Sequence, residues 1–183
     1  MSSILKVDQL QDSGGNNLVT SNGSGVITSA GFGKIGQVQS TTKTDTFSSS
    51  STNSFVEVTG LNVNITPSST SSKIFISGIV GIGNTTGTAG VYMKVQRGST
   101  DIGIGDANSS NPRSMAGSDV REYQIRQLSM NFLDSPNTTS QINYKVLISS
   151  PNSTMSVNKD GEDTTGTNHT RTISTITVME ISA

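Results

Sequence analysis

The chain has 183 residues, a net charge of −1, 31% hydrophobic and 14% charged residues, and no cysteine. This length suits one domain with an appendage. The missing basic excess argues against nucleic-acid binding, and the missing cysteines exclude disulfides and cysteine-ligated metals. The N-terminus "MSSILKVDQLQDSGG" lacks the features of a signal peptide, and no apolar run approaches the roughly 20 residues of a membrane helix. We therefore expect a soluble protein without membrane insertion.

The first 35 residues differ from the rest of the chain. They carry short apolar patches separated by Asn, Gly and Ser, and none of these patches is long enough to bury itself in a monomer. We predict an N-terminal arm over residues 1–35 that becomes ordered on its own copies or on a docking partner. The residues predicted to make these contacts are Leu5, Val7, Leu10, Val19, Val26 and Ile27.

From residue 36 onward the apolar residues follow the period of β-strands. In "GLNVNITP", Leu61, Val63 and Ile65 alternate with asparagines, and Pro67 ends the strand because proline cannot donate to a sheet ladder. "SKIFISGIVGIG" is almost continuously apolar. This pattern predicts a central strand that is either covered on both faces or placed at a subunit contact.

The later segments repeat the alternation. "GVYMKVQRGSTDIGIG" predicts a hairpin, while "RQLSMNFLDSP" and "SQINYKVLISSP" predict strands that stop before prolines. In "RTISTITVMEIS", Ile176 and Val178 fall in one phase and Ile173, Met179 and Ile181 in the other. Either both faces of this last strand are covered or a bulge shifts its register.

About eight strands separated by turn signals indicate an all-β fold. Only "SDVREYQIRQL" has a charge density compatible with a helical turn. We therefore predict an extended arm followed by an antiparallel, jelly-roll-like β-sandwich head over residues 36–183.

Three motifs with chemical potential have weak support. "GFGKIG" matches a dinucleotide-loop pattern but lacks the following helix, so we expect a junction and no bound cofactor. The single histidine, His169, lies in a polar loop without a second histidine or a cysteine, so we expect neither a catalytic residue nor a metal site there. "NKDGED" could offer oxygen ligands to calcium but lacks the EF-hand spacing, and a solvated hairpin turn explains it better.

Several longer phrases resemble a family of small bacteriophage structural proteins, known from marine and cyanobacterial phages as tail-fibre or head-fibre proteins. These phrases are "TTKTDTFSSSSTNSFVEVTGLNVNITPSSTSSKI", "FLDSPNTTSQINYKV" and "RTISTITVMEIS". The resemblance covers residues 35–183, and "ILKVDQLQDSGGNNLVTSNGSGVIT" is similar to the leading arms of phage fibres. It implies a virion protein, assembled in the host cytoplasm, that forms a homotrimer.

The resulting hypothesis is a non-enzymatic fibre. Its arm docks on other virion proteins, and its head projects toward a glycan or protein of the host surface through loops such as residues 106–118. The alternative is a capsid decoration or head-fibre protein that stabilises the shell without host recognition. A depolymerase would need paired carboxylates in a cleft, whereas the 13 acidic residues are scattered through loops.

Overall fold

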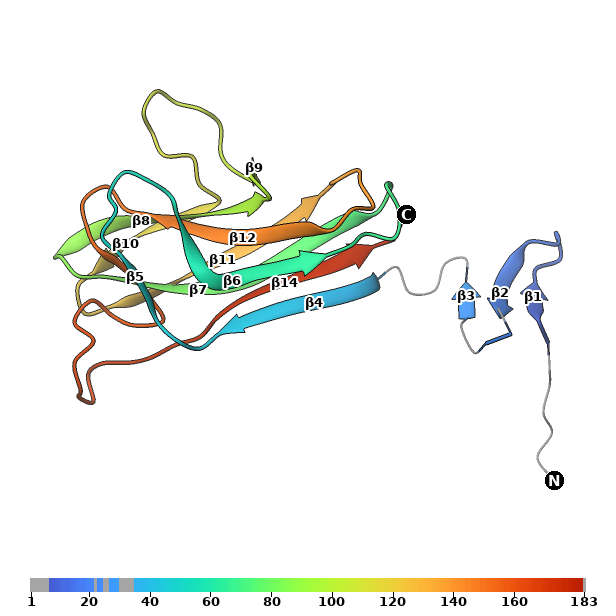
Figure 1. Ribbon diagram of the computed structural model, residues 1–183, viewed down its shortest axis with the longest axis horizontal. Helices are drawn as coiled ribbons and strands as arrows, with labels where there is room; N and C mark the ends of the chain where they lie inside the picture. The colour runs from blue at the N-terminus through green and yellow to red at the C-terminus, as the bar shows by residue number, and fades with distance from the viewer. Residues whose placement is uncertain (1–6, 22, 25–26, 30–34, 183) are drawn as a thin grey trace.

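The computed structural model describes residues 7–21, 23–24, 27–29 and 35–182, and within these ranges every regular element is a β-strand. The protein is all-β and its sheets are antiparallel, as the sequence predicts (Figure 1). The arm contains β1 (Gln9–Gln11), β2 (Asn17–Ser21) and β3 (Ile27–Ser29). The head contains β4 (Ile35–Lys43), β5 (Phe47–Ser49), β6 (Val56–Ile65), β7 (Lys73–Asn84), β8 (Thr88–Arg97), β9 (Thr100–Ile102), β10 (Ala116–Arg121), β11 (Ile125–Asp134), β12 (Ile142–Ser149), β13 (Met155–Val157) and β14 (Ser174–Ile181).

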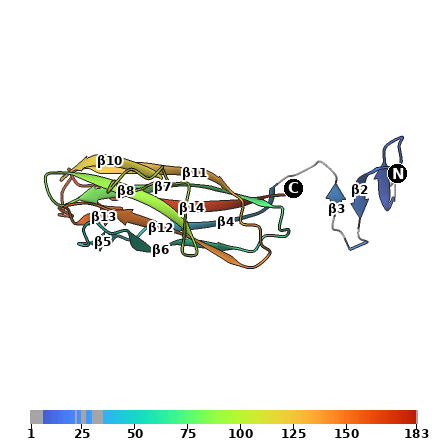
Figure 2. The same cartoon turned by 90° about the horizontal axis from the view of Figure 1, so that it is seen from above.

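The eight longest strands of the head form a jelly roll. One sheet has the order β4–β14–β7–β11, in which the short strands β13 and β5 continue beside β7, and the other has the order β6–β12–β8–β10. If the eight long strands are numbered along the chain, the first sheet contains strands one, eight, three and six in this order. The second sheet contains strands two, seven, four and five. Two four-stranded sheets with this connectivity are the double Greek key of a jelly roll. Figure 2 shows the two layers from above.

The core lies between the two sheets and contains apolar residues from every long strand except β4, among the described residues. Alternation places Leu61, Val63 and Ile65 of β6 inside, as predicted, and Tyr144 of β12 is fully buried. The Tyr144 hydroxyl donates to Asp134 at 2.7 Å, and Asp134 also pairs with Arg97 at 2.8 Å. Burial and the Asp134 carboxylate both raise the pKa of Tyr144, so this hydroxyl stays protonated. The buried Tyr144 hydroxyl is thus satisfied by Asp134, at the end of the edge strand β11.

Two strand predictions are refined by the structure. β7 is central, as expected, but Phe75, Ser77 and Ile79 on its outer face are only partly buried, so one chain does not fully cover both faces. In β14, Ile176 and Val178 enter the core, while Met179 and Ile181 lie half-buried on the outer face. The register against β4 also shifts between Met179 and Ile181. Both features therefore occur in β14: its register against β4 is shifted, and its outer face is incompletely covered.

The interpretation of "SDVREYQIRQL" as compatible with a helical turn is wrong. These residues form the end of β10, a turn at 122–124 and the start of β11. Val120 and Leu128 are buried in the core, and this strand-period burial outweighs the local charge density. Within the described ranges, no helical segment is long and apolar enough to cross a bilayer.

The arm strands form a sheet of their own, in the order β1–β2–β3. β1 and β2 pair through Leu10 and Val19, and β2 pairs with β3 from Val19 to Ser21. In Figures 1 and 2 this sheet is drawn beyond the end of the head at which β4 begins. The chain enters the jelly roll at Ile35, the first residue of β4.

Candidate functional site

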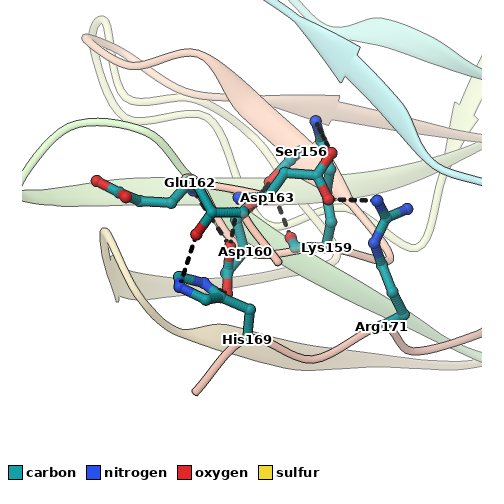
Figure 3. A network of polar contacts seen from close by, with 8 residues as sticks. Ser156, Lys159, Asp160, Glu162, Asp163, His169 and Arg171 are labelled. Carbon is teal, nitrogen blue, oxygen red and sulfur yellow. Dashed lines mark hydrogen bonds and ion pairs between the residues drawn. The ribbon is translucent and has the colours of Figure 1, made fainter. Parts of the chain in front are cut away.

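The long connection between β13 and β14, residues 158–173, forms a polar pocket at the end of the head where β4 finishes (Figure 3). The pocket has a volume of about 320 Å³. An isolated bridge between Lys159 and Arg171 closes the base of this loop. We call this site the 160–171 pocket, and it is lined by Asp160, Asp163, Thr164, Thr165, Gly166, His169, Thr170 and Arg171.

Asn158 holds the loop to the sandwich. It is fully buried and adopts φ 63°, a backbone conformation that asparagine tolerates better than most residues. Its side-chain amide donates to the carbonyls of Lys43 and Asp45 at 2.8 and 2.9 Å. Its side-chain oxygen accepts from the Ser174 hydroxyl at 2.6 Å. The loop is thereby anchored to the end of β4 and to the start of β14.

Asp160, His169 and Thr164 form a chain of hydrogen bonds. Asp160 Oδ2 lies 2.8 Å from His169 Nδ1, and His169 Nε2 lies 2.8 Å from Thr164 Oγ1. The Asp160 side chain is almost fully buried, whereas Thr164 is exposed. A carboxylate, an imidazole and a hydroxyl in this order match the arrangement of a nucleophilic triad.

Backbone donors also hold the Asp160 carboxylate. Its Oδ1 accepts from the N–H groups of Glu162 at 3.2 Å and Asp163 at 2.8 Å. Burial raises the pKa of Asp160, but the bonds from Asp163 and His169 outweigh burial, so the pKa lies below its usual value. This carboxylate is therefore ionised at neutral pH and shapes the turn.

The remaining charges of the pocket are paired. Asp163 contacts Lys159 at 3.0 Å and also pairs with Arg171. Glu162 interacts with the exposed Tyr123 of the β10–β11 turn and raises the pKa of that phenol. The Tyr123 and His169 ring centroids are 6.4 Å apart. The pocket therefore combines hydroxyls, an aromatic flank and nearly balanced charges.

The prediction of a solvated turn at "NKDGED" is wrong for two of its residues. Asn158 and Asp160 are buried, because their side chains satisfy backbone groups of the loop and of β4. In the described part of the chain, no three His, Cys, Asp or Glu residues are grouped so that they could hold a metal ion.

The structure also supplies partners that sequence reasoning missed. The sequence shows no partner for His169, whereas the loop brings Asp160 and Thr164 to its two ring nitrogens. Asp160 lies nine and Thr164 five positions before the histidine in an irregular loop. No periodic pattern in the sequence signals such an approach.

The predicted arm residues lie apart from this pocket. Val7 and Leu10 are 56% and 54% exposed, and Val19 is partly buried. Leu18, which the prediction omitted, is 38% exposed. Ile27 begins β3, while Leu5 and Val26 lie outside the described residues. In "GFGKIG", Gly31 and Gly33 also lie outside them, and Gly36 belongs to β4.

Comparisons with known proteins give limited similarity. No protein-family model matches the chain, and no curated protein matches it. Among solved structures, one similar chain comes from T=1 particles derived from infectious bursal virus. It has 14% identity and a TM-score of 0.42 over 87% of this chain and 39% of that chain. A VP2 subviral particle of infectious bursal disease virus has 14% identity and a TM-score of 0.36 over 80% and 38% of the two chains. This chain thus spans about two fifths of the length of those chains, and the jelly-roll assignment rests on its own strand order.

Proposed function

We propose that this chain is a non-enzymatic structural protein of a bacteriophage virion that assembles as a homotrimer through its N-terminal arm. The arm contacts other virion proteins, and the jelly-roll head projects outward and contacts a glycan or protein of the host surface. The observation that carries the proposal is the one-layered arm sheet, on which Leu10 and Leu18 are exposed.

The arm sheet needs a second layer. Its three short strands pair with one another in the described chain, and Val7, Leu10 and Leu18 remain exposed. Small isolated sheets are marginally stable in water unless an apolar face is packed against something. Sister copies supply that layer most directly, because each copy brings the same exposed side chains. The resemblance of the sequence to phage fibre proteins supports the same conclusion.

The head supports a role in surface contact. Jelly rolls are common in capsid and lectin domains. The chain enters the head at Ile35, the first residue of β4. The 160–171 pocket lies near the other end of this strand, where Asn158 bonds to Lys43. A trimer presents three such pockets, and linked weak sites gain strongly in avidity. We assign the Asp160–His169–Thr164 chain a structural role, since Asp160 also fixes two backbone N–H groups of the loop.

Light scattering on the full chain tests the assembly. We expect a mass three times the 19.1 kDa of one chain. The combined substitutions Val7→Ser, Leu10→Ser and Leu18→Ser should give a monomer, because they remove the exposed apolar contacts of the arm. The matched control Gln9→Ser, Gln11→Ser and Asn17→Ser changes exposed polar residues of the same sheet and should remain trimeric. A wild-type monomer at micromolar concentration would contradict the proposal.

The second candidate is a capsid decoration protein that stabilises the shell without host recognition. The one-layered arm sheet is equally consistent with this second function, since its exposed apolar side chains could pack on a capsid shell as well as on sister arms. Binding of the labelled trimer to host cells separates the two functions. Saturable binding supports adhesion, while stabilisation of particles without cell binding supports decoration.

A further inference from the structure

A line of apolar side chains crosses the outer face of the β4–β14–β7–β11 sheet. Val38 of β4 is paired with Met179 of β14, Met179 with Phe75 of β7, and Phe75 with Leu133 of β11. Directly paired residues point to the same face of a sheet. The next residues along the strands, such as Ile74 and Val178, are fully buried in the core, so these four side chains point outward. We call Val38, Phe75, Leu133 and Met179 the apolar row.

The apolar row is accessible to solvent in a single chain. Val38 is 52% and Leu133 46% exposed, and Phe75 and Met179 are partly buried. The pair Ile35 and Ile181 extends the row at the end of the sheet, and Ile35 is 54% exposed. Contiguous exposed apolar side chains of this kind often mark an interaction site, whereas single exposed apolar side chains do not.

The surroundings of the row carry little charge apart from Lys73, which is exposed on β7 and pairs with Ile181. The next line across the sheet consists of Ser40, Thr177, Ser77 and Asn131. Ser40 and Thr177 share a hydrogen bond of 2.8 Å, and Ser77 donates to Asn131 at 3.1 Å. A different protein is usually selected through complementary charge, and the four residues of the row carry none. An identical face meets the four residues of the row without like-charge repulsion, and only Lys73 at the end of the sheet would approach a like charge, so the occupant that fits best is a second copy.

The position of the row leads to the same occupant. Ile35 is the first residue of β4, and Val38 follows three residues later, so the row lies where the head joins the arm. Copies that are linked through their arms hold these ends of their heads close together. Their high effective concentration then favours even a modest apolar contact. This step rests on the proposed assembly through the arm.

We propose that the apolar row is the contact between the heads of neighbouring copies of this chain. In the trimer, the β4–β14–β7–β11 sheets face inward and bury the row, and the β6–β12–β8–β10 sheets face outward. The half-buried outer faces of β7 and β14 then become a covered subunit contact.

Thiol labelling tests this contact, because the natural chain contains no cysteine. Val38→Cys and Leu133→Cys each place one thiol in the row of the full chain. Asn64→Cys places a matched thiol at an exposed position of β6, in the other sheet. In a trimer, we expect the two row thiols to react at least ten times more slowly with a maleimide than the Asn64→Cys thiol. In the monomeric arm variant, all three thiols should react at similar rates.

Light scattering on each variant separates the two proposals. A trimer with slow row thiols supports the inference. A trimer in which all three thiols react equally fast would overturn the head contact and leave the assembly through the arm intact. A wild-type chain that is monomeric would overturn both.

Discussion

At the scale of single residues, Asn158 has more structural consequence than the acidic residues that follow it. Its side chain makes three hydrogen bonds, to the end of β4 and to the start of the neighbouring β14, and none of its surface is exposed. Removing the amide would take the donor from the carbonyl of the buried Lys43 and the acceptor from the hydroxyl of the buried Ser174, and an unsatisfied buried group costs about 1–3 kcal/mol.

We therefore expect Asn158→Ala to lower the free energy of unfolding by about 3 kcal/mol. Urea unfolding monitored by circular dichroism measures this change. The control Asn168→Ala removes an exposed amide from the same loop and should change the stability by less than about 0.5 kcal/mol. Equal effects of the two substitutions would show that Asn158 is not the anchor of the loop.

Glu180 is the second residue whose environment has a measurable consequence. Its carboxylate is almost fully buried on the inner face of β14. It accepts from the Ser68 backbone N–H at 2.7 Å, the Ser68 hydroxyl at 2.6 Å and Gln37 Nε2 at 2.7 Å. Burial raises the pKa of Glu180, but these donors outweigh burial and lower the pKa to about 2.

This pKa predicts an acid-sensitive head. Because the folded-state pKa lies below the ordinary value of 4.5, the stabilisation from Glu180 is fully present above that value. It is lost as the pH falls from about 4.5 toward 2, and it amounts to roughly 3 kcal/mol. Thermal unfolding at pH 7 and pH 3 should show about two thirds of this loss in the wild type, and Glu180→Gln should show a smaller one. A variant with the full wild-type pH dependence would contradict this assignment.

At the scale of elements, most of the head could be predicted from the sequence because alternation with period two specifies which residues are buried. The predicted strand containing Leu61, Val63 and Ile65 is an example. The polar pocket could not be predicted, since its residues meet through an irregular loop closed by the Lys159–Arg171 bridge. The apolar row lies between these cases. The second phase of β14 signalled an apolar outer face, but only the register aligns Met179 with Val38 and Phe75.

The close approach of β7 and β14 gives a prediction for the central strand. A Cβ atom added to Gly78 would lie 2.1 Å from the carbonyl oxygen of Thr175, which is backbone and cannot move away cheaply. We expect Gly78→Ala to destabilise the head by about 3 kcal/mol. At Gly105, an added Cβ meets no described atom within 4 Å, so Gly105→Ala should be nearly neutral. Urea unfolding of both variants measures the difference, and similar stabilities would show that the two strands can separate without cost.

At the scale of the whole molecule, the chain has two differently stabilised parts. The head has a closed core between two sheets, whereas the arm sheet has one layer in the described residues. The sequence indicated this division through short apolar patches that are too small to form a core. It could not indicate how copies meet, because their contacts depend on faces that only the folded sheet creates.

The first and last strands of the jelly roll are neighbours, and Ile35 lies opposite Ile181. A peptide fused behind the C-terminus would consequently emerge beside the arm, on the attachment side of the protein. An epitope inserted between Thr165 and Gly166 would instead be displayed at the other end of β4, about 30 Å away for a nine-residue strand. The connectivity of the sheet thus decides which engineered fusions remain visible once the protein is mounted on a particle.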